Sequence, residues 1–201
     1  SQSDLSKLKD ISDSCAVDGY QISVLKSRGF EVSASKLELE SIEHTNDVQC
    51  HIKVYKDGRV ANSATSSLNF PSMQSCLEQA ARQVVFTSPD DCNIIPDATL
   101  QAGAVADCDL YHPWNLQVDD AAEMILELSK AANALHKDVR SEAADICSTE
   151  YAYEFFDSNG FYAQQRTSRH SVSLQMIAGS GENMQTDSDY TIARDANDLR
   201  S

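Results

Sequence analysis

Residues 20 to 66 alternate between apolar and polar side chains, and this alternation constrains the fold more than any other feature of the chain. The apolar positions form short sets two residues apart: Ile22/Val24, Phe30/Val32/Ala34, Leu37/Leu39 and Ile52/Val54. A period of two predicts half-buried strands. Asp57-Gly58 predicts a tight hairpin, because both central residues of a type I′ turn need positive φ. Ser35-Lys36 predicts another turn, so the segment should form a strand meander.

Three segments have helical spacing instead. Leu5, Leu8, Ile11 and Cys15 follow a capping Ser3 and predict a short helix that ends near Asp18-Gly19. Apolar residues from 73 to 85 predict a helix that stops before Ser88-Pro89, because the residue preceding a proline is steered out of the helical region. Asp120 and Glu123 resemble a capping box, and the apolar stripe that follows predicts a helix over 119–136.

The second half of the chain should contain strands as well. Residues 152–156 and 171–177 read as strands, with a turn at 157–160, whereas 89–114 lack periodicity and predict a connecting segment. We therefore expect an α+β fold: an N-terminal strand meander with two helices, then a helix-plus-antiparallel-strands lobe. The expected domains are 1–90 and 110–201, with 91–109 as the linker.

Charge and composition narrow the class of protein. With 31 acidic against 16 basic residues, the net charge of −15 repels phosphate backbones and argues against a nucleic-acid partner. No apolar run is long enough for a membrane span, and residues 1–10 are polar rather than typical of an export signal. Six cysteines at wide, irregular intervals are typical of free thiols in a reducing compartment. We expect a soluble, cytoplasmic protein.

Few residues stand out as candidates for chemistry. No two of the five histidines lie three to five residues apart, so no local metal motif and no catalytic residue is assigned. The run 166–171 gathers two guanidiniums, an imidazole and three hydroxyls, a mixture that binds carboxylates or peptide backbone, so Arg166, Arg169 and His170 are the candidate substrate-binding residues. The alternative is an ordinary solvated basic strand end. Asp187, Asp189, Asp195 and Asp198 lack the Gly and Glu of a calcium loop and read as a solvated acidic segment.

The order of several segments resembles the PmbA/TldE proteins of the PmbA/TldD family. Asp109-Leu110-Tyr111-His112-Pro113-Trp114 before an acidic, alanine-rich helix resembles the start of that family's middle region. The similarity continues, in order, with 158–161, 167–171, 184–187 and 189–194. Upstream, 28–32, 39–43, 57–58, 63–66 and 88–91 are collinear with family segments. The chain departs from the family pattern around Arg140 to Ala144 and around Val48 to Cys50, where glycines are missing.

This resemblance implies a function that the residues alone do not. PmbA/TldE proteins, also called modulators of DNA gyrase, are bacterial partner subunits of a TldD–TldE metalloprotease that cleaves peptides and unfolded proteins, in peptide-antibiotic maturation and antitoxin turnover. In the TldD branch an H-E-x-x-x-H helix holds zinc or a similar metal beyond the point that matches Ser201. The resemblance therefore implies a non-catalytic subunit that is inactive alone, dimerises with a TldD-type protein and holds no metal itself.

Two alternatives stay open from the sequence. One is a stand-alone binding or regulatory module on the same fold, without a protease partner. The other concerns length: the resemblance runs unbroken to the last residues, so we expect the full-length protein to continue beyond Ser201.

Overall fold

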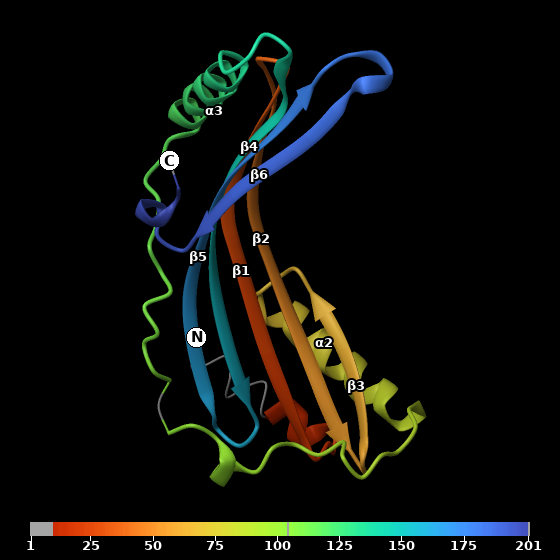
Figure 1. Ribbon diagram of the computed structural model, residues 1–201. Coiled ribbons are helices and arrows are strands. Elements are labelled where there is room, and N and C mark those ends of the chain that lie inside the picture. The colour runs from red at the N-terminus through yellow and green to blue at the C-terminus, as the bar shows by residue number, and fades with distance from the viewer. Residues whose placement is uncertain (1–9, 104, 201) are drawn as a thin grey trace. The chain divides into compact units, whose positions relative to one another are not determined.

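The computed structural model describes residues 10–103 and 105–200, and it has an α+β fold built on a six-stranded antiparallel sheet (Figure 1). The strands run in the order β3-β2-β1-β4-β5-β6. Their bounds are β1 (Gly19–Ser35), β2 (Glu38–Lys56), β3 (Arg59–Thr65), β4 (Val139–Asp157), β5 (Tyr162–Ala178) and β6 (Gln185–Ala193). The helices described in full are α2 (Phe70–Gln83) and α3 (Val118–Asn133), and residues 10–14 are also helical. Short 3₁₀ turns occur at Val84–Phe86, Ala98–Leu100, Gly181–Asn183 and Ala196–Asp198.

The chain divides into two compact units whose residues interleave in sequence. Unit 1 comprises 1–26, 47–107 and 152–165, and unit 2 comprises 27–46, 108–151 and 166–201. Strands β1, β2, β4 and β5 each contribute residues to both units, so neither unit is one continuous stretch of chain. The sequence-based boundaries 1–90, 91–109 and 110–201 stay a prediction.

Unit 1 buries its core between α2 and the strands beside it. The core includes Ile22, Ile52 and Val54 from the strands and Leu77 and Val84 from the helical segment. Figure 1 shows α2 beside β3. Asn69 caps this helix by accepting a hydrogen bond from the Ser72 amide at 2.9 Å, and Pro71 occupies the first turn, where a missing N–H costs nothing.

Unit 2 has a second core, beneath α3. Val32, Ile125 and Ile146 are fully buried there, and Trp114 and Leu174 pack against them. The acidic first turn of α3, with Asp119 and Asp120, suits the positive end of the helix dipole. This core fixes the strand segments that carry the candidate site residues.

The predicted turns and the two full helices are confirmed. Asp57 and Gly58 both have positive φ, 49° and 66°, and the hairpin pairs Lys56 with Arg59. The turn after Ser35 is also present, with positive φ at Lys36 and Leu37. Helix α3 begins one residue before the predicted start and ends at Asn133 rather than 136.

The predicted strands are too short, and one strand was not predicted. β4 begins at Val139, although only 152–156 were expected. Three of the four buried positions before residue 152 are small (Ser141, Ala144 and Ser148) and only Ile146 is large, so the apolar alternation is weak. β6 was not predicted: two of its residues, Asp187 and Asp189, were read as part of a solvated acidic segment, and none of its side chains is buried. The first helix ends at residue 14 rather than near Asp18-Gly19, because the chain turns at Ala16, whose φ of 51° is incompatible with a continuing right-handed helix. Its predicted residues Leu5 and Leu8 lie outside the described residues.

Two further expectations concern thiols and membranes. All six cysteines lie in the described part of the chain and are free thiols. In residues 10–103 and 105–200, no helix combines the length and the apolarity needed to cross a bilayer.

Candidate functional site

The candidate residues Arg166, Arg169 and His170 lie in the middle of a strand, not just before one as the sequence indicated. β5 runs from Tyr162 to Ala178 and carries all three. Because successive side chains of a strand point to opposite faces, the strand separates Arg169 from the other two. The structure therefore brings Arg166 and His170 to one face of β5 and Arg169 to the other.

His170 is fully buried, at 0% exposure, and both of its ring nitrogens are engaged. Nε2 lies 2.8 Å from the carbonyl oxygen of His112, and Nδ1 lies 3.0 Å from the Ser148 hydroxyl. A carbonyl oxygen only accepts, so Nε2 donates, and a neutral ring accepts from Ser148 at Nδ1. Trp114 packs its edge against the imidazole, with ring centroids 5.4 Å apart. His170 is thus an internal anchor for the 109–114 segment.

Ser168 holds the same 109–114 segment and, in addition, the chain after β6. Its amide donates to the carbonyl of Leu110 at 3.0 Å, and its hydroxyl accepts from the amide of His112 at 2.8 Å. The same hydroxyl donates to the carbonyl of Arg194, also at 2.8 Å. We call His112, Ser148, Ser168 and His170 the His170 anchor. It fastens the segment before α3 and the chain after β6 to β5.

Arg166 is held at the surface by an aromatic ring and a carboxylate. Its guanidinium carbon lies 3.6 Å from the centroid of the Tyr111 ring, and Nη2 lies 3.7 Å from a carboxylate oxygen of Glu150. The Tyr111 hydroxyl donates to the same carboxylate at 2.5 Å. This hydrogen bond to Glu150 is the main reason that the pKa of Tyr111 is raised above its ordinary value. Arg166 therefore already has protein partners for its charge.

Arg169 lies on the opposite face of β5, over a polar pocket of about 390 Å³. We call this the Arg169 pocket; it is lined by Glu31, Asp145, Cys147, Thr149, Tyr151, Arg169, Ser171 and Ser173. The Asp145 carboxylate accepts from the Ser33 hydroxyl at 2.7 Å and from the Ser173 hydroxyl at 3.0 Å. Asp145 is therefore bound on both sides, by β1 and by β5.

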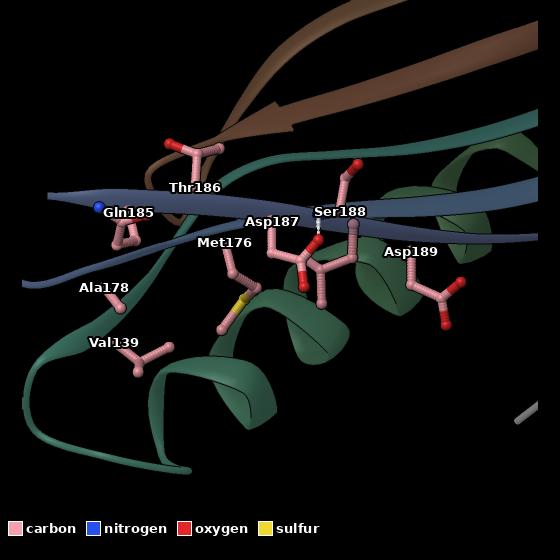
Figure 2. A pocket seen from close by; sticks show the side chains of 9 residues that line it. Val139, Met176, Ala178, Gln185, Thr186, Asp187, Ser188 and Asp189 are labelled. Carbon is pink, nitrogen blue, oxygen red and sulfur yellow. Dashed lines mark hydrogen bonds between the residues drawn. The ribbon is translucent and has the colours of Figure 1, made fainter.

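A second pocket of unit 2 lies along the β5–β6 hairpin. It has a volume of about 550 Å³ and is lined by Val139, Leu174, Met176, Ala178 and residues 185–189. Figure 2 shows Met176, Asp187 and Asp189 pointing to the side on which α3 passes, whereas Thr186 and Ser188 point away from it. This pocket is apolar along β5 and acidic along β6, where Met176 pairs with Asp187.

The residues described do not fit a metal ion. Within 10–103 and 105–200, no three His, Cys, Asp or Glu side chains are grouped so that they could hold one. His170 has no nitrogen left to offer, and Nε2 of His112 lies 3.0 Å from the carbonyl oxygen of Asp109. Asp195 caps a 3₁₀ turn by accepting from the Asn197 amide at 2.9 Å.

Sequence reasoning missed most of the pocket and the anchor. Ser148 and Asp145 lie in the part of β4 that was not predicted, and Ser33 and Ser173 gave no signal by themselves. The alternation along residues 168–174 did carry usable information, since it places Ser168, His170 and Val172 on one face and Arg169, Ser171 and Ser173 on the other.

Comparison with known proteins gives the same family for two parts of the chain. The model of the PmbA/TldA metallopeptidase domain 1 matches residues 20–84, and the model of the central domain matches residues 111–201. The chain is 33% identical over 182 residues to a metalloprotease PmbA homolog of Haemophilus influenzae, covering 90% of this chain and 40% of the relative. It is 29% identical to metalloprotease PmbA of Escherichia coli O157:H7, over 92% of this chain and 41% of that relative. The chain thus spans about two fifths of the length of these relatives.

Solved structures share the fold. A candidate modulator of DNA gyrase from Bacteroides thetaiotaomicron superposes with a TM-score of 0.87 at 16% identity, over 99% of this chain and 46% of that one. TldE from Thermococcus kodakarensis superposes with a TM-score of 0.75 at 17% identity, over 98% of this chain and 44% of TldE. At these identities the likeness concerns the fold alone.

Proposed function

Since this chain belongs to the PmbA/TldD metallopeptidase family as a PmbA/TldE-type protein, we propose that it is part of the non-catalytic subunit of a TldD–TldE-type metalloprotease. Its partner is a TldD-type protein, which supplies the zinc or similar metal and the bond cleavage. The pair is a cytoplasmic heterodimer. Its substrates are peptides and unfolded proteins, as in peptide-antibiotic maturation and antitoxin turnover.

The observation that carries the non-catalytic role is the engagement of His170. It is the one imidazole in the candidate run, and a general base or a metal ligand needs a ring nitrogen that is open to a substrate or a metal. Both nitrogens of His170 are used to hold the 109–114 segment and Ser148, away from solvent. This arrangement supports binding and positioning as the role of this part of the chain.

The three candidate substrate-binding residues then have different roles within this proposal. His170 and Arg166 position the chain around them, because their polar groups are already paired. Arg169 is the residue that contacts substrate.

Metal content and peptidase activity test the proposed role. The purified chain is analysed for bound metal by mass spectrometry and is incubated with an unstructured fluorogenic peptide, alone and after mixing with a TldD-type protein. We expect no stoichiometric metal and no cleavage by the chain alone, and cleavage in the mixture above the rate of the TldD-type protein alone. Stoichiometric metal in the chain, or cleavage by the chain alone, would contradict the proposal.

A further inference from the structure

We propose that the Arg169 pocket binds an extended peptide through a carboxylate, which Arg169 and Ser171 hold together. This inference rests on the proposed function and gives it a site and a ligand chemistry. The carboxylate comes either from the C-terminus of the peptide or from an acidic side chain. In both cases the same guanidinium and hydroxyl receive it.

The Arg169 guanidinium forms no hydrogen bond or ion pair with the residues that the structure describes. Two other arginines of unit 2 are engaged: Arg166 with Tyr111 and Glu150, and Arg194 with Thr167 and the carbonyl of Ser168. Arg169 is exposed and lines the pocket.

Asp145, one of the two carboxylates that line the pocket, is engaged by hydroxyl groups instead of by Arg169. Both oxygens of Asp145 are occupied by hydroxyls, from Ser33 at 2.7 Å and from Ser173 at 3.0 Å. These bonds tie Asp145 to β1 and β5 and satisfy its charge locally. Glu31, the other carboxylate that lines the pocket, forms no ion pair with Arg169 among the described residues, so the guanidinium is open to an incoming carboxylate.

The spacing of Arg169 and Ser171 on β5 indicates the shape of the ligand. Ser171 lies two residues after Arg169 on β5, so the two side chains share a face and their Cα atoms are about 7 Å apart. Among the residues that the structure describes, the Ser171 hydroxyl is also without a hydrogen-bond partner. Two open donors at a two-residue spacing match an extended peptide, in which alternate groups point the same way. A guanidinium binds a carboxylate with two parallel hydrogen bonds, which fixes the orientation of the peptide.

The test measures binding of short fluorescein-labelled peptides to the purified chain by fluorescence anisotropy. The first probe is a valine- and threonine-rich peptide with a free C-terminal carboxylate, and the second is the same peptide with a C-terminal amide. The third and fourth are amidated peptides with a central glutamate or a central glutamine. Tighter binding of the free acid than of its amide assigns the C-terminus as the ligand, and tighter binding of the glutamate than of the glutamine peptide assigns a side chain. Equal binding of all four peptides, or binding of none, overturns the proposal.

Variants connect the binding to the pocket. We expect Arg169→Gln to weaken binding of the preferred carboxylate peptide at least about tenfold, because a hydrogen bond to a charged group is lost in a partly desolvated site. Ser171→Ala should weaken it about two- to fivefold, and Arg169→Lys should retain part of the affinity. Arg82→Gln, at another exposed arginine, is the matched control and should leave binding unchanged. A urea midpoint equal to that of the unaltered chain checks that each variant is folded.

Binding by Arg169→Gln within twofold of the unaltered chain overturns the proposal. The measurement needs no partner protein and no metal. Its failure therefore leaves the proposed pairing with a TldD-type protein intact, and failure of the pairing leaves the binding result intact.

Discussion

His170 has a structural role because it is buried and both of its ring nitrogens have partners. An imidazole between hydroxyl-bearing neighbours, in a family of peptidases, invites a catalytic interpretation. The geometry favours a structural one, since Nε2 donates to the His112 carbonyl and Nδ1 lies 3.0 Å from the Ser148 hydroxyl in a site closed to solvent. The sequence could not distinguish these roles, because they depend on what faces the ring from β4 and from the 109–114 segment.

Replacing His170 with alanine should therefore destabilise the protein. The change leaves the His112 carbonyl without its donor and opens a cavity beside Trp114. We expect a loss of about 2 to 4 kcal/mol in the free energy of unfolding, measured by urea denaturation. His51→Ala, at an exposed position of β2, is the control and should stay within about 0.5 kcal/mol of the unaltered chain. Equal losses for both variants would contradict the anchor role.

Cys50 should make the protein less stable at high pH. Burial, with a smaller contribution from Cys76, raises the pKa of the Cys50 thiol to about 11, whereas an unfolded chain has a thiol pKa of about 8.5. Its stabilising contribution is therefore fully present below the unfolded pKa. It is lost as the pH rises toward 11, because the unfolded state releases its proton first.

The comparison with Cys50→Ala isolates this contribution. Under reducing conditions, the urea midpoint of the unaltered chain should fall more steeply between pH 8.5 and about 11 than that of the variant. Tyr20, whose pKa is also raised, mainly by burial, is present in both proteins and cancels in the difference. Parallel curves for the two proteins would refute this account.

Among the elements, those with strong local signals could be predicted from the sequence. The Asp57-Gly58 hairpin and α3 depend on turn chemistry and on an apolar stripe, and both occur close to where they were expected. The first half of β4 and the whole of β6 were missed. The inward residues of β4 there are mostly Ser and Ala, and β6 has no buried face to produce an alternation. Those strands form because neighbouring strands supply hydrogen bonds, which is tertiary information.

The N-cap of α2 makes a measurable contribution to this element. The Asn69 side chain accepts from the Ser72 amide, so Asn69→Ala should cost about 1 kcal/mol of stability in urea denaturation. Gln117 occupies the N-cap position of α3 but makes no capping bond with its side chain, so Gln117→Ala is the matched control and should cost little. A cost for Gln117→Ala as large as that for Asn69→Ala would argue against a capping effect.

Gly29 allows β1 and β4 to approach closely within unit 2. A Cβ at this position would lie 2.1 Å from the carbonyl oxygen of Ser148 and 2.8 Å from the Cα atom of Thr149. Both are backbone atoms, which cannot yield without distorting the strand pair. Gly29→Ala should cost at least about 2 kcal/mol of stability in urea denaturation.

Gly103 provides the control for that substitution, since nothing lies within 4 Å of an added Cβ there. Gly103→Ala should leave the urea midpoint nearly unchanged. If both glycine variants unfold at the midpoint of the unaltered chain, the two strands do not approach each other closely at Gly29.

For the whole molecule, the order of its motifs was enough to predict the family. The residue types in the candidate run were not enough to predict the site. Arg166, Arg169 and His170 all lie on β5, and Arg169 lines a pocket there, whereas the polar groups of Arg166 and His170 already have protein partners. These two residues hold the chain in place. The residue types in the run were informative, but the face on which each one lies depends on where β5 begins.

A titration of peptidase activity distinguishes a partner subunit from an independent protein, because a partner subunit acts only through its complex. Increasing amounts of the chain are added to a fixed concentration of a TldD-type protein, and cleavage of an unstructured peptide is followed. If the chain is part of such a subunit, activity rises with added chain and saturates at a fixed molar ratio, while the chain alone cleaves nothing. A flat titration, or cleavage by the chain without its partner, would contradict this role.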